Sequence, residues 1–410
     1  MFTTSNIFSN EEALRNDWVP DELPEREDEI DKLKFAFRPA TNGTTPHNIF
    51  LYGKSGQGKT AATEYVLEGL REFFHGEGSE LGTDLNVIYA SCEDAHSSYQ
   101  VVGEILTAVE PGTTDRPKGH SIGDLNKRLF RALDKKGGLN AIILDEIDSI
   151  GSDDSILYQI PRAQSNGRLE NAHVSVVGIS NDFDFYNNLS RKVKDTLCDV
   201  ELHFEPYDAN QLRTILRQRE QIGFTDGVLE DDVIPLCAAL AAQDHGSARQ
   251  AIQYLHRAGE LARDDGVETV TEGHVHRAQD EIDKEDLIED FVSMTTQDKL
   301  ALAGLLILEI KGDVPARTKE IYTQYTKITE FIDADTYTKR RMYDHLQAMS
   351  THGFIESREV NKGHRQGRHL EFELKIGVNE AIEALEQDSR FSGIPGKLQE
   401  IQELSEFPSR

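Results

Sequence analysis

Short apolar runs alternate with helical patterns through the first half of the chain. The runs lie near residues 47–52, 86–92, 139–145, 173–180 and 200–204. Each run has the length of a strand, and helix-forming stretches separate them. Such alternation is typical of a parallel sheet with helices on both faces, so we predict an α/β core.

An additional helical insert interrupts this plan between the second and third strands. Helical patterns at about 97–109 and 121–135 flank the segment Pro111–Ser121, whose prolines and glycines predict a loop. We place the insert at about residues 97–130.

A helical region follows the fifth strand. Residues 207–284 show helical patterns throughout, with Gly246 and Gly266 as breaks. We predict a small helical lid over these residues, which leaves residues 1–206 to the core.

The last third of the chain has a different pattern. Helical stretches at about 296–310, 317–331 and 335–351 precede two alternating runs at 354–360 and 369–375. Three helices and a β-hairpin predict a winged helix, an α+β domain that we place at residues 290–410.

A glycine-rich loop stands between the first strand and a helix. Gly53–Thr60 reads Gly-Lys-Ser-Gly-Gln-Gly-Lys-Thr, and glycine lets the backbone approach phosphate oxygens without a Cβ in the way. Lys59 can reach the β- and γ-phosphates, Thr60 can hold Mg²⁺, and the helix N-terminus adds partial positive charge. We predict that ATP or ADP is bound here by Ser55, Gly56, Gln57, Gly58, Lys59, Thr60 and Ala61.

Polar residues end the third and fourth strands. Ligands of open α/β sheets collect at the carboxyl ends of the strands, so Asp145 is placed to bind Mg²⁺ with Thr60. Glu146 can orient and activate the attacking water. Asn181 could hold that water or the γ-phosphate by its amide, although an Asn-Asp pair after a strand is usually a turn. Asp148 reads more simply as a helix cap or a solvated acid.

The chain is strongly acidic, with 73 acidic against 44 basic residues and a net charge of −29 over 410 residues. High charge and low hydrophobicity usually indicate disorder, but the strand and helix patterns contradict that. Acids spread along every segment are typical of a protein from a very salty cytoplasm, where carboxylates retain water and ions screen their repulsion. We therefore predict a halophilic protein.

Three cysteines, Cys92, Cys198 and Cys237, lie far apart with no Cys-x-x-Cys pair, so we expect neither a zinc site nor a disulfide framework. The N-terminus lacks a basic region followed by a long apolar stretch, and the longest apolar run, Leu300–Leu308, is too short to cross a bilayer. We expect a cytoplasmic, nucleoid-associated protein with no membrane partner.

One region reverses the charge of the chain. Residues 336–375 carry eight Lys or Arg against five acids, a net of +3. Basic runs are usually solvated faces, but these cations fall on the third helix and the hairpin tip, the parts of such domains that contact the DNA grooves and backbone. We predict that double-stranded DNA is bound by Lys339, Arg340, Arg341, Lys362, Arg365 and Arg368.

Together these features resemble the archaeal replication initiators, a family of AAA+ ATPases related to the eukaryotic origin recognition complex and the cell division cycle helicase loader. The resemblance covers nearly the whole chain. Its more specific parts are the segments Trp18–Glu27, Tyr158–Arg162, Gly178–Asp182 and Phe204–Tyr207. The implied fold is a AAA+ parallel-sheet core with a helical lid, followed by the winged helix.

The resemblance also implies residue roles. Asp145 and Glu146 would be the Walker B pair, and Asn181 the first sensor. Arg249 would be the second sensor, which reaches from the lid to the γ-phosphate, and a guanidinium fork suits that role. Four further positions would lie close to the nucleotide: Val19, Arg26, Tyr207 and Arg219.

Two positions depart from the family pattern. Ser247 stands where the family usually has aspartate, which puts the usual capping of the lid in doubt. Lys192, preceded by Arg191, stands where the family has an arginine that reaches a neighbouring subunit's ATP. Lysine lacks the bidentate geometry of arginine, so this contact is in doubt as well. The insert matches an initiator element that touches DNA, which disfavours a clamp loader or a proteolytic machine.

The function that the resemblance implies is an ATP-dependent initiator with slow ATPase activity used as a switch. It would bind origin DNA, help to recruit or load the replicative minichromosome-maintenance helicase, and work with other initiator paralogues. Two alternatives remain: an ATP-dependent winged-helix regulator of transcription or of a replicon, and a helicase loader whose main contact is protein.

Overall fold

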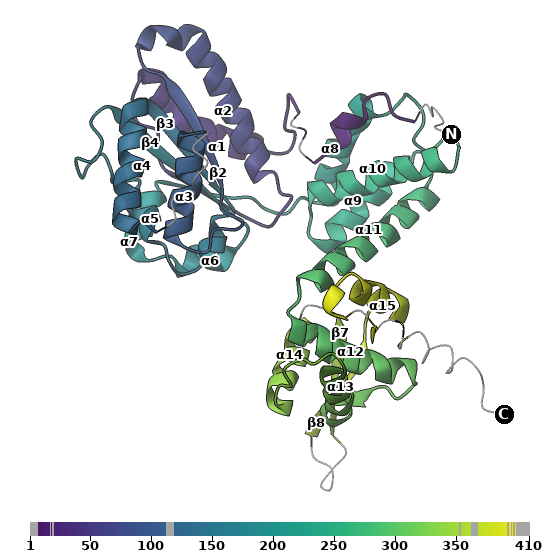
Figure 1. Cartoon of the computed structure of the whole chain (residues 1–410). Coiled ribbons are helices and arrows are strands. Elements are labelled where there is room, and N and C mark those ends of the chain that lie inside the picture. The colour runs from purple at the N-terminus through teal and green to yellow at the C-terminus, as the bar shows by residue number, and fades with distance from the viewer. Residues whose placement is uncertain are drawn as a thin grey trace, which may run out of the picture. The chain divides into compact units, whose positions relative to one another are not determined.

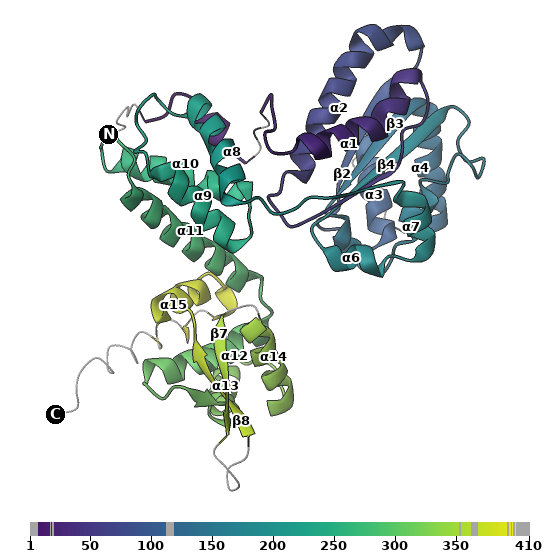
Figure 2. The same cartoon turned by 180° about the vertical axis from the view of Figure 1, so that it is seen from behind.

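The computed structural model describes residues 7–16, 18, 20–111, 119–351, 354–361, 368–391, 393, 394, 396 and 398. The chain forms two compact units, one that runs to Ala278 and one that begins at Gln279. Figures 1 and 2 show the elements of both units from opposite sides.

A five-stranded parallel sheet forms the centre of the first unit, which confirms the predicted α/β core. The strands lie in the order β2-β3-β4-β1-β5. Tyr52 is paired with Ser180 and Ser91 with Asp145, so several strands end together at one edge of the sheet. The bounds are β1 Ile49–Tyr52, β2 Leu85–Ser91, β3 Gly138–Asp145, β4 Ala172–Ser180 and β5 Val200–His203.

Helices cover both faces of this sheet (Figure 2). Helices α1 (Glu27–Phe37) and α2 (Lys59–His75) pack on one face through a shared apolar cluster. The opposite face is covered by α3 (Ser98–Val109), α4 (Ile122–Lys136), α5 (Ser155–Gln159), α6 (Phe183–Asn188) and α7 (Arg191–Leu197).

The two helices of the predicted insert, α3 and α4, belong to the core packing. Val101 and Ile105 of α3 and Leu129 and Leu133 of α4 are fully buried in the apolar cluster of that face. Burial of whole helix faces contributes most of a helix's stability, so both helices are fixed to the sheet. The insert loop lies partly outside the described residues, at 112–118.

The predicted helical lid is confirmed and comprises α8 (Ala209–Gly223), α9 (Val233–Asp244), α10 (Ala248–Asp264) and α11 (Glu272–Ser293). Asp208 caps α8 with a capping box, in which its carboxylate accepts from the N–H groups of Asn210 and Gln211. Helix α11 continues beyond the predicted end of the lid at residue 284.

The N-terminal residues pack on the lid, which the sequence did not indicate. The N–H groups of Ser9 and Asn10 donate to the carbonyl of Gly223 at 3.0 and 3.1 Å, and Thr225 donates to Ile7 O at 3.0 Å. Figure 1 shows this purple segment beside α8. Residues 7–14, which include a 3₁₀ turn at Glu11–Leu14, therefore form a strap on the lid.

The second unit contains the predicted winged helix. Its three-stranded antiparallel sheet has the order β6-β8-β7. Helix α14 begins at Lys339, four residues later than expected, and the Tyr337 N–H before it donates to the Tyr325 hydroxyl at 2.8 Å. The elements are α12 Thr296–Ile310, β6 Ala316–Arg317, α13 Thr318–Phe331, α14 Lys339–Thr351, β7 Ile355–Asn361, β8 Arg368–Leu374 and α15 Val378–Glu386.

Among the helices in the described parts of the chain, none has both the length and the apolar character that crossing a membrane requires.

Candidate functional site

The glycine-rich loop connects β1 to α2 in a backbone conformation that requires glycine. Gly56 and Gly58 have φ angles of +76° and +85°. A Cβ at Gly56 would overlap the hydroxyl of Ser247, and one at Gly58 would lie 3.0 Å from the Tyr207 hydroxyl. The loop is therefore shaped both for close backbone approach and for contact with the lid.

Lys59 is the first residue of α2 and is only 4% exposed. Its ammonium donates to the carbonyls of Gly53 and Lys54, both at 2.7 Å. Burial lowers the pKa of Lys59 to about 8, although the nearby Asp145 acts in the opposite direction. The ammonium is thus hydrogen-bonded to the backbone of the same loop that is predicted to bind the phosphates.

Three donors converge on the Asp145 carboxylate at the end of β3. The Thr60 hydroxyl donates to Oδ2 at 3.0 Å, and the backbone N–H of Glu146 donates to Oδ1 at 3.0 Å. The Tyr89 hydroxyl donates to Oδ2 as well, in a short hydrogen bond. Hydroxyl and carboxylate oxygens are the ligands that Mg²⁺ prefers, so this pair of Thr60 and Asp145 fits the predicted cation.

Tyr89 was not predicted from the sequence. It lies on β2, and in the parallel pairing Tyr89 is opposite Ile143 and Ser91 is opposite Asp145. Because side chains alternate along strands, Tyr89 and Asp145 point to the same face. The strand order would have been needed to see this.

Glu146 and Asn181 meet beside this carboxylate. Asn181 Nδ2 donates to Glu146 Oε1 at 3.4 Å, and the Asn181 N–H donates to Asp148 Oδ1 at 3.0 Å. Asp148 therefore holds the Asn181 backbone. Burial, together with the charges of Glu93, Asp145 and Asp148, raises the pKa of Glu146, which makes its carboxylate a stronger base.

Arg249 reaches the loop from the first turn of α10. Its Nη1 donates to Ser55 Oγ at 3.3 Å, and the neighbouring Ala248 N–H donates to Gly56 O at 3.0 Å. Ser247 caps α10, since its hydroxyl accepts from the Gln250 N–H at 3.2 Å. The serine thus provides a cap in place of the aspartate expected from the family pattern.

These groups line one cavity of about 380 Å³. The lining includes the loop, Asp145, Glu146, Asn181 and Arg249. The lining also includes residues of the lid and of the chain that precedes α1: Trp18, Leu23, Ile215, Gln218 and Arg219. Sequence reasoning had not indicated Trp18 or Gln218 as individual lining residues.

Two of the four further predicted nucleotide residues line the cavity, Tyr207 and Arg219. Arg219 is 7% exposed, lies 4.3 Å over the Trp18 ring and donates to Ala13 O at 2.8 Å, and burial lowers its pKa to about 10. Burial raises the pKa of Tyr207 to about 12. Val19 lies outside the described residues.

Arg26 braces the loop and does not line the cavity. Its guanidinium donates to the carbonyls of Gln57 at 3.1 Å and Glu205 at 2.6 Å, and pairs with Glu29 at 3.0 Å. It also lies 3.8 Å over the Tyr207 ring. Its contacts therefore help to hold the backbone of the loop in place.

Buried polar atoms without partners remain in the cavity wall. Within the described parts of the chain, both amide atoms of Gln57 and Nε of Arg219 are buried and make no hydrogen bond. Buried polar groups are normally satisfied, whereas Gln57 and Arg219 hold polar atoms without protein partners beside the cavity.

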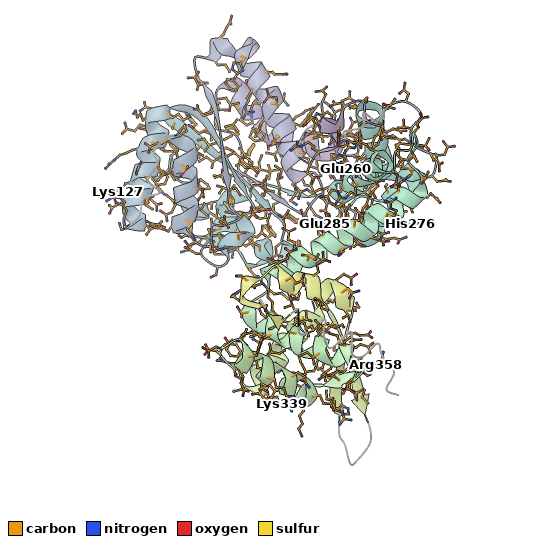
Figure 3. The ribbon with its side chains drawn as sticks, turned by 45° about the vertical axis from the view of Figure 1, so that its right-hand side comes forward. Lys127, Glu260, His276, Glu285, Lys339 and Arg358 are labelled. Atoms are coloured by element: carbon orange, nitrogen blue, oxygen red, sulfur yellow. The ribbon has the colours of Figure 1, made fainter. Side chains whose placement is uncertain are left out.

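Three exposed cations begin α14 in the winged helix: Lys339, Arg340 and Arg341. The first turn of this helix contains no acid, although the positive end of a helix dipole disfavours cations. Arg341 lies 5.3 Å over the Tyr337 ring. Figure 3 labels Lys339 on this helix.

The remaining predicted DNA-binding residues are Lys362, Arg365 and Arg368. Lys362 and Arg365 lie outside the described residues, and Arg368 is described only as the first residue of β8.

Arg191 and Lys192 begin α7 and are exposed, and Lys192 stands at the position where the family has an arginine directed at a neighbouring subunit. The Arg191 side chain is 93% exposed.

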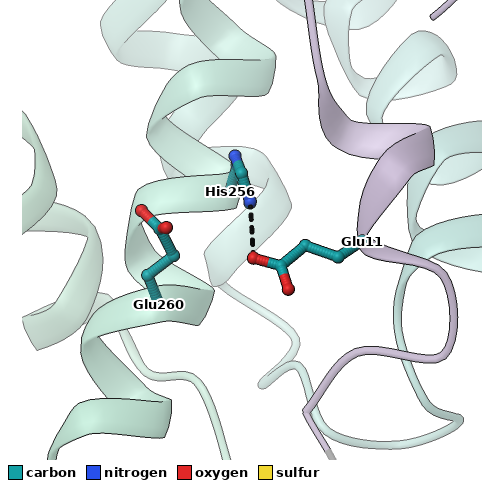
Figure 4. A group of neighbouring side chains, drawn as sticks. All are labelled: Glu11, His256 and Glu260. Carbon is teal, nitrogen blue, oxygen red and sulfur yellow. Dashed lines mark hydrogen bonds and ion pairs between the residues drawn. The ribbon is translucent and has the colours of Figure 1, made fainter.

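A separate charged cluster joins the strap to the lid. Glu11 Oε1 lies 3.2 Å from His256 Nε2, and Glu260 stands nearby on α10 (Figure 4). Arg263 meets Glu11 at 2.8 Å, and Arg257 meets Glu260 at 3.3 Å. Both carboxylates are thus paired with guanidinium groups, so we assign this cluster to fastening the strap and not to a metal.

Three protein families match successive parts of the chain. Residues 22–177 match the AAA ATPase domain, residues 213–280 the Cdc6 AAA+ ATPase-type lid domain, and residues 289–384 the CDC6 C-terminal winged helix domain. The matches agree with the core, lid and winged helix described above.

Curated relatives span nearly the whole chain. ORC1-type DNA replication protein 1 of Haloarcula marismortui is 41% identical over 405 residues, which cover 95% of this chain and 94% of that protein. ORC1-type DNA replication protein 8 of Halobacterium salinarum is 39% identical, with 92% and 96% covered. The ORC1-type protein of Pyrococcus abyssi is 39% identical, with 90% and 88% covered.

A solved structure shares the fold of the chain. The Aeropyrum pernix ORC1 protein, determined in complex with DNA, is 36% identical with a TM-score of 0.82, and 95% of this chain and 99% of that chain are covered. Family matches, relatives and structure agree, and the chain therefore belongs to the family of ORC1-type DNA replication proteins, AAA+ ATPases with a Cdc6-type lid and a C-terminal winged helix.

Proposed function

We propose that this chain is an ATP-dependent replication initiator that binds ATP in the cavity lined by the phosphate loop and origin DNA through its winged helix. One observation carries the nucleotide part: the loop, Asp145, Glu146, Asn181 and the lid's Arg249 line the same cavity. A lone glycine-rich loop occurs by chance, but this set of side chains from core and lid fits phosphate binding and hydrolysis.

The chain's own residues have distinct tasks in this proposal. The loop N–H groups and the N-terminus of α2 bind the phosphates, and Lys59 exchanges the carbonyls of Gly53 and Lys54 for phosphate oxygens. Thr60 and Asp145 would hold Mg²⁺, which neutralises phosphate charge when bound. The residues fit it, because their oxygens already lie 3.0 Å apart.

Hydrolysis would depend on Glu146 and Asn181. Glu146 orients the attacking water and accepts its proton, and the Asn181 amide keeps the Glu146 carboxylate in place. We expect slow turnover that serves as a switch, in which the lid reports the state of the nucleotide through Arg249.

Arg249→Ala is expected to lower ATP hydrolysis about 10²-fold, because a charged donor aimed at the phosphates is lost. ATP affinity should fall much less. Arg257→Ala, on the same helix but outside the cavity lining, is the matched control. Single-turnover hydrolysis of radiolabelled ATP measures the effect. Equal rates for the two variants would exclude the sensor role.

Two basic surfaces support DNA binding. The first is the start of α14, where three cations occupy the unfavourable end of the helix dipole. The second is on α4, where Lys127, Arg131 and Lys135 are exposed and recur every four residues along one helix face. Figure 3 labels Lys127. In a chain of net charge −29, cations gathered in this way fit a polyanionic partner.

The double variant Arg340→Ala/Arg341→Ala is expected to weaken binding to origin DNA at least tenfold, since each base or phosphate contact contributes about 1–3 kcal/mol. ATP binding should stay unchanged. Lys311→Ala, an exposed lysine after α12, is the control for lost charge. Gel shifts with the intergenic region beside the gene measure this. Unaltered affinity would remove α14 from the interface.

We extend the proposal to recruitment of the minichromosome-maintenance helicase and to contacts with initiator paralogues, on the family resemblance alone. Footprinting of the purified protein across its own genomic neighbourhood, followed by helicase pull-down on the protected DNA, tests this. Protection confined to promoters, with no helicase retained, would favour a transcriptional regulator.

A further inference from the structure

We propose that Tyr89 is a positioning residue for Asp145, which it holds in the orientation that divalent-cation binding requires. The inference rests on the proposed ATP site. It assigns a role to the edge strand β2, which contributes no residue to the predicted phosphate, magnesium or sensor groups.

The geometry around Asp145 Oδ2 carries this proposal. Thr60 from α2 and Tyr89 from β2 both donate to this one oxygen, while Oδ1 accepts from the Glu146 N–H. The carboxylate is therefore held by side chains of α2 and β2 and by the backbone of the residue that follows it. Loss of one donor would free it to rotate toward the remaining two.

The chemistry suits a cation that Thr60 and Asp145 share. With its proton committed to Oδ2, the Thr60 oxygen keeps its lone pairs for a metal ion. Tyr89 adds a second neutral donor to the same carboxylate without adding charge. A donor behind a metal-binding carboxylate typically raises metal affinity by 10- to 100-fold.

A third acid lines the cavity. Glu64, one turn after Thr60 on α2, lines the cavity with Tyr89. With Asp145 and Glu146 it makes three carboxylates in the cavity lining, whose mutual repulsion favours a divalent cation.

A packing role alone would not require the hydroxyl. Tyrosine is an ordinary residue of an edge strand, and Tyr89 is 44% exposed. Phenylalanine would preserve the packing of the ring and remove only the donor. Tyr89→Phe therefore separates the two roles.

For Tyr89→Phe we expect unchanged affinity for a fluorescent ATP analogue in EDTA, within about twofold. Mg²⁺ should raise the affinity for the analogue, and the Mg²⁺ concentration that produces half of this rise should increase about tenfold in the variant. Tenfold is the lower end of the effect of losing a hydrogen-bond donor behind a metal-binding carboxylate. Titration with Mn²⁺, with free Mn²⁺ counted by electron paramagnetic resonance, gives a readout independent of hydrolysis.

Tyr186→Phe is the matched control. Its hydroxyl also donates to a carboxylate, Glu201 Oε1, at 2.5 Å. Glu201 lies on β5, at the opposite edge of the same sheet, and neither residue lines the cavity. It should match the unmodified protein in every titration. Thermal melts of both variants establish that they are folded.

A double-mutant cycle with Asp145→Asn keeps the proposal testable if Tyr89→Phe is destabilised. Coupling of Tyr89 to Asp145 predicts that Tyr89→Phe has little further effect on Mn²⁺ affinity once Asp145 is altered. Unchanged metal dependence in Tyr89→Phe, or full additivity in the cycle, would overturn the proposal. Failure of the unmodified protein to bind ATP would instead overturn the proposed function.

Discussion

Lys59→Ala is expected to lower ATP affinity by about 10²-fold or more, whereas Glu146→Gln should bind ATP normally and lose hydrolysis. Lys59 carries the buried ammonium of the loop, and hydrogen bonds to charged groups contribute about 1.5–3 kcal/mol each. Glu146 is the proposed base for the attacking water, and its replacement by glutamine removes the base while the amide keeps the shape.

Lys54→Ala is the control for Lys59. Lys54 stands in the same loop and carries the same charge, but its ammonium points to His245 at 3.4 Å and it does not line the cavity. It should retain ATP affinity within about threefold, as expected for an exposed charge. Isothermal titration with ATP and a slowly hydrolysed analogue measures all three variants. Equal loss of binding in Lys59→Ala and Glu146→Gln would contradict the assignment of Lys59 to ATP binding and of Glu146 to hydrolysis.

The local sequence pattern predicts those parts of the site whose position follows from the direction of the chain through a strand. Gly53–Thr60 follows a strand and begins a helix, so its position at the sheet edge is fixed by sequence order. Asp145 ends β3 and Asn181 follows β4, and parallel strands bring their carboxyl ends to the same edge. For these residues, knowing that the sheet is parallel was enough.

The parts that pattern could not predict depend on packing between distant segments. The contact of Tyr89 with Asp145 needs the strand order β2-β3, which the runs themselves do not encode. The strap is fastened to the lid by backbone bonds from Ser9 to Gly223, more than two hundred residues later. No local periodicity reports such a pairing.

Arg26 shows a further limit. The family resemblance placed it close to the nucleotide, and it is close to the loop, but its guanidinium is committed to the carbonyls of Gln57 and Glu205. A buried arginine whose donors are used by the backbone is a support for the site. Sequence can indicate that a residue is near a site, whereas the partners of its donors decide what it does there.

DNA binding is expected to persist at molar KCl, with a shallow dependence on salt. If each of the six predicted cations neutralised one phosphate, log affinity would fall with log salt with a slope of about −5, or roughly five decades between 0.1 and 1 M. At 1 M the Debye length is about 3 Å, so only direct contacts survive. We expect a loss of no more than about one to two decades.

The physical reason is the acidity of the chain. With a net charge of −29, protein carboxylates and DNA phosphates repel each other at low salt, and cations taken up between them offset the counterions that the basic residues release. Recognition then rests on hydrogen bonds, apolar fit and DNA shape. The relatives in Haloarcula and Halobacterium agree with this halophilic interpretation.

A single neutralised acid tests that mechanism. Asp344 is exposed on α14, three and four residues from Arg341 and Arg340, so Asp344→Asn should tighten binding at low salt and steepen the slope by up to about one unit. Asp313→Asn, an exposed acid in the loop after α12, should change neither quantity. Fluorescence anisotropy from 0.1 to 3 M KCl, with circular dichroism at each point, gives both slopes. A steep fall in affinity for folded protein, with Asp344→Asn no different from Asp313→Asn, would mean that the acidic surface takes no part in DNA binding.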